Sequence, residues 1–191
     1  MNSKTVFLGG TRMYNSMPTD IQILLKKWIA KNYSFIVGDA PGVDTAFQRF
    51  LLEKKVDQVT IFTSAPHLRN NLGSWKSIKI DSGLKTSSHA MHTAKDRYMS
   101  QICDLALMIW DELSLGTISN VIDVVTKEKM CFIYKIRSEK IYKIENASIL
   151  EKFLIDYPIE KLQAEKRLNQ FSRRSIRQSK VNRKKLVSLF D

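Results

Sequence analysis

Residues 5–12, TVFLGGTR, join a short apolar run to a pair of glycines. Similar arrangements occur at residues 35–48 (FIVGDAPGVDTAFQ) and 105–120 (LALMIWDELSLGTISN). Each apolar run stops at small, polar or acidic residues, and a helical pattern lies farther along the chain. Unbroken apolar runs are typical of strands that are covered on both faces. Because such runs alternate here with helical patterns, the sequence predicts a mostly parallel, Rossmann-like sheet.

The apolar periodicity extends this prediction along the chain. We expect strands at residues 5–9, 34–37, 58–62, 105–110 and 130–134, and helices at residues 21–30, 43–54, 94–102 and 117–127. The segment between residues 63 and 92 has no clear period, so a long surface loop is expected, and its length favours a lid or a binding loop. The sequence therefore predicts an α/β, three-layer Rossmann-like domain over residues 1–137.

The pattern changes after residue 137. Residues 140–147 (KIYKIENA) favour an edge strand, and residues 148–157 favour a short helix with Ser148 as its N-cap. Residues 160–191 hold ten Lys or Arg and three Asp or Glu, so they carry +7 of the formal net charge of +12. We predict a C-terminal extension over residues 138–191 with a basic, helical tail. This tail is expected to be dispensable for folding of the sheet.

Two interpretations of the basic tail stay open. Its sparse apolar residues could dock an amphipathic helix on this domain, a second copy or a partner, with the basic face in solvent. Alternatively, the tail binds nucleic acid, because Lys and Arg near phosphates gain affinity through counterion release. No nucleic-acid-binding motif distinguishes the two.

Composition and local patterns argue against several classes. The first apolar run is too short for a secretory signal, and no run approaches the roughly 18 apolar residues of a membrane span. Cys103 and Cys131 lie in apolar surroundings and are expected to be buried free thiols, which favours a cytoplasmic protein. Although His89 and His92 are close in sequence, no suitable partner lies near them, so neither a metal nor another cofactor is expected.

The ends of the three apolar runs predict a ligand site. In an open parallel sheet, ligands bind in the crevice at the carboxyl ends of the strands. Glycines at these ends let the backbone approach a ligand, and a helix that begins after such a turn points free N–H groups at an anion. We therefore expect the site to bind a phosphate group, and we expect Asp44 and Asp111 to accept hydrogen bonds from ribose hydroxyls. The alternative is that the glycines form only tight turns.

Three segments in this order, GGTR (9–12), GDAPGVDTAFQ (38–48) and AKDRYMSQICDLALMIWDELSLGT (94–117), resemble the SLOG superfamily. This Rossmann-like group includes the DprA DNA-processing proteins and the LOG phosphoribohydrolases, and there is a fainter likeness to nucleoside deoxyribosyltransferases. The resemblance covers about residues 5–135. It implies a pocket for a nucleotide or a nucleotide-derived ligand, with the phosphate held by the Arg12 fork. The ligand-binding residues implied are Gly9, Gly10, Thr11, Arg12, Gly38, Ala40, Gly42, Asp44, Ser114, Gly116 and Thr117.

One departure from the family bears on the chemistry. LOG-type hydrolases carry one or two glutamates just after the late Gly-Thr pair, where this chain has Ser119 and Asn120. The expected function is therefore a binding module or sensor. The alternative is an enzyme that hydrolyses or exchanges the N-glycosidic bond of nucleoside monophosphates or related nucleotides. Asp111 would stabilise an oxocarbenium-like state and Asp96 would act as the acid, although Asp96 could equally form an i,i+4 pair with a neighbouring base or cap its helix.

The resemblance also bears on assembly. Many SLOG-like proteins act as dimers or larger assemblies, so a homo-oligomer is implied by the resemblance alone.

Overall fold

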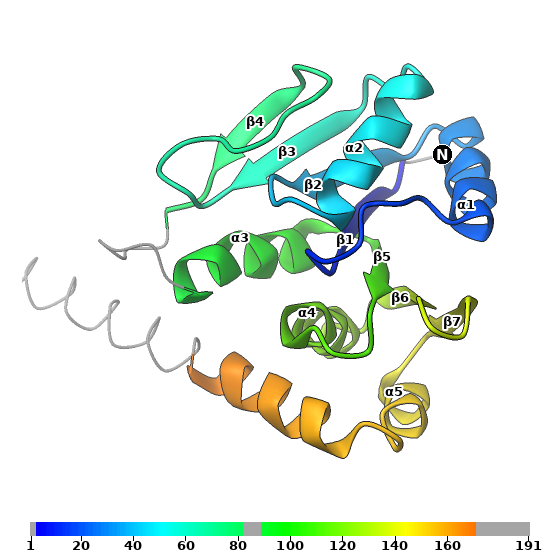
Figure 1. Cartoon of the computed structure of the whole chain (residues 1–191), viewed down its shortest axis with the longest axis vertical. Helices are drawn as coiled ribbons and strands as arrows, with labels where there is room; N and C mark the ends of the chain where they lie inside the picture. Colours follow the sequence, from blue (N-terminus) through cyan, green and yellow to red (C-terminus); the bar gives the residue numbers. More distant parts are fainter. Residues whose placement is uncertain (1–2, 82–88, 171–191) are drawn as a thin grey trace, which may run out of the picture.

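The computed structural model describes residues 3–81 and 89–170, and of residues 89–92 only the backbone. These residues form a seven-stranded sheet in the order β4-β3-β2-β1-β5-β6-β7 (Figure 1). Strands β1 to β6 are parallel and β7 pairs antiparallel with β6. This confirms the predicted α/β class and the mostly parallel sheet. The strands are β1 (Thr5–Gly10), β2 (Ser34–Gly38), β3 (Val59–Thr63), β4 (Lys76–Lys79), β5 (Leu105–Trp110), β6 (Met130–Lys135) and β7 (Lys140–Ile144).

Helices cover both faces of the sheet and give the molecule three layers (Figure 1). Helices α1 (Thr19–Ala30) and α2 (Val43–Glu53) pack on one face. Helices α3 (His89–Ile102) and α4 (Leu115–Val125) pack on the other. Outside α4 lie α5 (Ala147–Phe153) and a further helix at residues 158–170, the orange ribbon of Figure 1.

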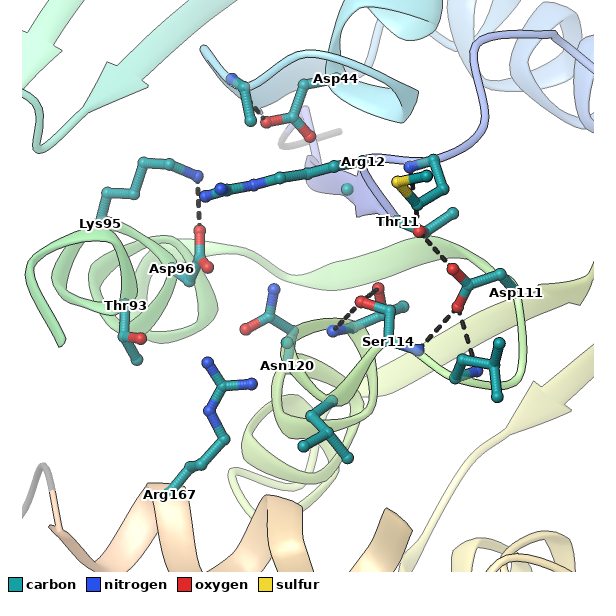
Figure 2. Close-up of a pocket in the computed structure, with 18 of the residues that line it drawn as sticks. Thr11, Arg12, Asp44, Thr93, Lys95, Asp96, Asp111, Ser114, Asn120 and Arg167 are labelled. Atoms are coloured by element: carbon teal, nitrogen blue, oxygen red, sulfur yellow. Dashed lines mark hydrogen bonds and ion pairs between the residues drawn. The ribbon is translucent and has the colours of Figure 1, made fainter. Parts of the chain in front are cut away.

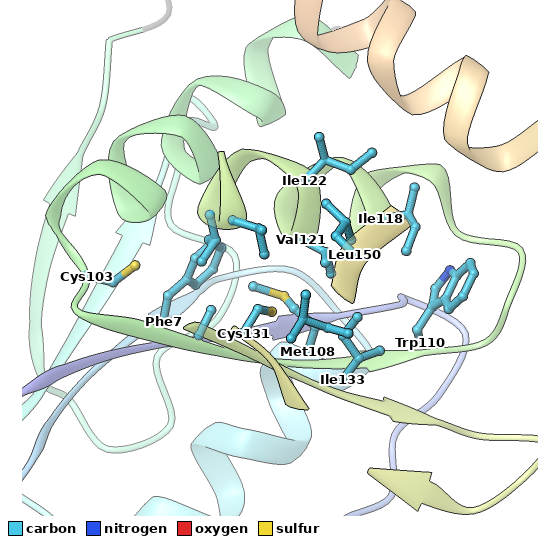
Figure 3. Packing of buried hydrophobic residues seen from close by; sticks show 14 of the residues in the cluster. Phe7, Cys103, Met108, Trp110, Ile118, Val121, Ile122, Cys131, Ile133 and Leu150 are labelled. Carbon is cyan, nitrogen blue, oxygen red and sulfur yellow. The ribbon is translucent and has the colours of Figure 1, made fainter. Parts of the chain in front are cut away.

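Strand β5 shows why the apolar runs are unbroken. Its side chains alternate between the two faces of the sheet, as every strand requires. Leu105, Leu107 and Ile109 belong to the core under α1 and α2. Ala106, Met108 and Trp110 belong to the core under α3 and α4, where Figure 3 shows Met108 facing the side chains of α4. Since both faces are covered, every position of this strand is buried.

Residues 63–92 are not simply the long loop that the sequence predicts. Strand β4 lies within this range and pairs with Thr60–Thr63 of β3, and α3 begins at His89. The side chains of β4 are mostly exposed, because β4 is the edge strand of the sheet. Because most of its side chains are exposed, β4 needs no apolar run, and backbone hydrogen bonds to β3 set its position.

The described part of the C-terminal extension shares the core of the sheet domain. Strand β7 confirms the expected edge strand, but α5 is capped by Asn146 rather than by Ser148, and its side chain accepts a hydrogen bond from the Ile149 N–H at 3.0 Å. Ala164 of the helix at 158–170 is fully buried in the same cluster as Trp110 and Leu150. The predicted tail continues through residues 171–191, which lie outside the described residues.

Two further sequence predictions can be compared with the structure. Cys103 and Cys131 are buried and free, as expected, and burial raises the pKa of the Cys103 thiol to about 11. In the two described ranges, no helix combines the length and the apolar character that crossing a membrane would require.

Candidate functional site

A pocket of about 760 Å³ lies at the carboxyl ends of β1 and β5. These two strands are neighbours in the sheet, but β1 is followed by α1 on one face and β5 by α4 on the other. The strand order therefore reverses here, and this topological switch point is where open α/β sheets bind ligands. Loops, α3, α4 and the helix at 158–170 complete the wall.

Most of the residues that the sequence predicts for a site line this pocket. The residues in the lining are Gly9, Gly10, Thr11, Arg12, Ala40, Asp44, Asp96, Asp111, Ser114, Gly116 and Thr117. Gly38 and Gly42 are not in the lining. A Cβ atom at Gly38 would lie 2.3 Å from the Asp44 carboxylate. Gly42 has φ of 83°, and its Cβ would lie 2.4 Å from the Arg12 carbonyl oxygen, so both glycines act by letting lining residues approach.

Asp111 joins two of the loops that form the pocket. Its Oδ2 accepts a hydrogen bond from the Thr11 hydroxyl at 2.5 Å, which connects the end of β5 to the end of β1. Its Oδ1 accepts from the backbone N–H groups of Leu113 and Ser114 at 3.1 and 2.7 Å. The carboxylate that sequence reasoning assigned to catalysis thus already accepts three hydrogen bonds that hold the loops together (Figure 2).

A cluster of two acids and one base forms another part of the wall. Lys95 of α3 is only 5% exposed, and its Nζ lies 2.6 Å from Asp96 Oδ1. Burial opposes the charge on Lys95, but Asp96 and Asp44 outweigh burial and raise the pKa of this lysine. Burial raises the pKa of Asp44 to about 6, although Lys95 and the Ala40 N–H favour its ionised form. Lys95 is therefore charged at neutral pH. Asp44, with a pKa of about 6, titrates just below neutral pH.

The first turn of α4 forms a third part of the wall. Ser114 is the N-cap, and its Oγ accepts hydrogen bonds from the Thr117 backbone N–H and hydroxyl at 3.4 and 3.0 Å. Asn120, one turn later, also lines the pocket, whereas the buried Ser119 donates its hydroxyl to the Leu115 carbonyl at 2.7 Å. LOG-type hydrolases carry glutamate at these two positions. In this chain the Asn120 amide lines the pocket, and the Ser119 hydroxyl is hydrogen-bonded within α4.

Sequence reasoning missed several polar lining residues, among them Thr93, Lys95, Asn120 and Arg167. Lys95 had a detectable signal, because it lies four residues before the buried Met99 and so occupies the apolar stripe of its helix. Arg167 had none. It comes from the helix at 158–170, in a basic segment without a motif, and only the packing of that helix brings it to the pocket (Figure 2).

The described residues contain no group of three or more His, Cys, Asp or Glu side chains arranged to hold a metal ion. Comparison of the chain with models of protein families, with curated proteins and with solved structures finds no match. The case for a function therefore rests on the pocket and on the motifs that meet there.

Proposed function

We propose that this pocket binds a nucleotide or a nucleotide-derived ligand, as a SLOG-like binding module or sensor. The observation that carries the proposal is the convergence of three segments that lie far apart in the sequence. The end of β1, the loop before α2 and the loop between β5 and α4 all contribute to one pocket at the switch point of the sheet. Its volume of about 760 Å³ lies within the range of roughly 300–1,000 Å³ that small-molecule sites occupy.

The lining offers partners for each part of a nucleotide. Arg12 is exposed, and its guanidinium has no ion-pair partner in the described part of the chain, so it can hold a phosphate through two parallel hydrogen bonds. The carboxylates of Asp44 and Asp96 can accept hydrogen bonds from ribose hydroxyls. Leu113 and Leu115 provide apolar surface against which a base can pack.

The contacts of the acids favour binding over cleavage of a glycosidic bond. Cleavage requires a carboxylate close to the anomeric carbon and an acid for the leaving base. Asp111 connects two loops through three hydrogen bonds, and Asp96 pairs with Lys95. Since both predicted catalytic acids have such partners, and Asn120 is an amide, we assign the pocket to binding.

Thermal-shift measurement with AMP, cyclic AMP, NAD and ADP-ribose tests the proposal. A ligand at a hundred times its Kd stabilises the folded chain by about 2.7 kcal/mol, which corresponds to a rise in Tm of about 5–10 °C for a chain of this size. Arg12→Gln should weaken binding of a phosphate-bearing ligand by about tenfold or more, because it removes charge-assisted hydrogen bonds.

Arg49→Gln is the matched control, since Arg49 is exposed on α2 and is not a lining residue. The proposal would be abandoned if no ligand of the panel raised Tm, or if both variants weakened binding equally. Chromatography of the same mixtures tests the enzymatic alternative. Release of free base by the wild type that Asp111→Asn abolishes would favour an N-glycosidic enzyme instead.

A further inference from the structure

The helix at 158–170 contributes one side of the pocket and brings Arg167 into its lining. Figure 2 shows Arg167 on the opposite side of the pocket from Arg12, with Thr93, Asp96 and Asn120 between them. Core packing holds this helix in place, because Ala164 is fully buried and Leu168 packs against the same cluster. This packing fixes the backbone from which Arg167 reaches the pocket.

An ion-pair network of α3 and α4 lies beside Arg167. Asp123 of α4 forms ion pairs with both Arg97 and Lys127, at 2.5 and 2.6 Å, so two cations share one carboxylate. Two guanidinium nitrogens of Arg97, Nε and Nη2, are buried without a hydrogen-bond partner among the described residues. Burial lowers the pKa of Arg97. Asp123 and Asp96 oppose this shift, whereas the charge of Arg167 adds to it, so the two arginine charges repel each other. An anion bound at Arg167 would relieve this repulsion.

The neutral groups on this side of the pocket also suit an anion. Asn120 can donate its amide N–H groups to a ligand oxygen, whereas a carboxylate at this position would repel an anion. Thr93 also belongs to the lining. The pocket thus has an arginine at each side, with Thr93, Asn120 and the Asp96 carboxylate, which is paired with Lys95, between them.

We propose that the ligand carries a second anionic group, in addition to the one at Arg12, and that Arg167 binds this second group. The inference rests on the proposed function and narrows its ligand class to nucleotides with two anionic groups. Such groups occur as phosphates on separate ribose positions or as successive phosphates of one chain. The volume of about 760 Å³, toward the upper end of the usual range of roughly 300–1,000 Å³, leaves room for the larger ligand.

Calorimetric titration of the full chain with adenosine 5′-monophosphate, adenosine 3′,5′-bisphosphate and adenosine 5′-diphosphate tests this inference. At least one of the two doubly anionic ligands should bind the wild type about 10- to 100-fold more tightly than the monophosphate, the gain typical of hydrogen bonds to a charged group. Which of the two shows the gain identifies where the second anion lies.

Arg167→Gln should abolish this gain, so that the doubly anionic nucleotide binds the variant no more tightly than the monophosphate does. Lys166→Gln is the matched control, because it removes the same charge from an exposed neighbour on the same helix that is not a lining residue. Arg167→Lys should keep part of the gain in affinity, since lysine retains the charge but lacks the two parallel N–H donors of the guanidinium. The Tm of each variant without ligand, compared with that of the wild type, checks that the helix remains packed.

Three results would overturn the inference. If the wild type binds all three nucleotides equally well, the second anion has no site, although the proposed function stands. If Arg167→Gln and Lys166→Gln reduce the gain equally, it comes from general positive charge and not from Arg167. If none of the three nucleotides binds, both the proposed function and the inference built on it fail.

Discussion

Replacing Asp44 with asparagine should change how stability depends on pH. In the wild type, burial raises the pKa of Asp44 to about 6 from its ordinary value of 3.8, so the folded chain binds this proton more tightly than the unfolded chain does. Ionisation of Asp44 therefore lowers the free energy of unfolding as pH rises between about 4 and 6. The full loss above this range is about 3 kcal/mol, at roughly 1.36 kcal/mol per pKa unit. The asparagine amide does not titrate, so the Asp44→Asn variant escapes this loss.

Urea denaturation of both proteins at intervals from pH 4 to pH 8 measures the effect. The difference in unfolding free energy, variant minus wild type, should rise by about 2.4 kcal/mol between pH 4 and pH 7 and then level off. The pKa of Asp44 also depends on the charges of Lys95, Asp96 and Asp39, all of which both proteins retain. The matched control is Asp57→Asn, at an exposed carboxyl just before β3. A difference that stays constant with pH, or falls as pH rises, would refute the reasoning.

Two further predictions concern the C-terminal extension. Tyr157→Phe removes the hydrogen bond from the tyrosine hydroxyl to Glu112 Oε2 (2.6 Å) and should lower the unfolding free energy by about 1–3 kcal/mol in urea titrations. Tyr142→Phe, in the same aromatic cluster, is its control, and an equal loss in both variants would contradict a specific role for the bond. A chain ending at Tyr157 should lose about 2 kcal/mol, against the sequence expectation of a dispensable tail, because the buried Ala164 and the partly buried Leu168 are removed. The chain ending at residue 170 keeps both residues, so equal stability of the two truncated chains would show that this helix is not part of the core.

Local pattern was a good guide wherever burial on both faces leaves a continuous apolar run. Strand β5 is the clearest example, because its buried residues 105–110 match the run in the sequence. The same reasoning failed for β4, whose exposed side chains give no signal and whose place depends on backbone pairing with β3. It also misplaced the start of α5, because Asn146 and Ser148 are both good N-cap residues and only the path of the chain after β7 decides between them.

The sequence by itself determined the parallel sheet and the strand ends at which glycines and acids gather, because both depend on residues that are close together along the chain. Only the tertiary structure decided how those groups are used. In the folded chain Asp111 accepts a hydrogen bond from Thr11, and the buried Lys95 pairs with Asp96. Arg167, from the helix at 158–170, lines the pocket. The physical reason is that hydrogen bonding and charge pairing depend on distances of a few ångströms, and packing creates many of these distances between residues that are far apart in sequence.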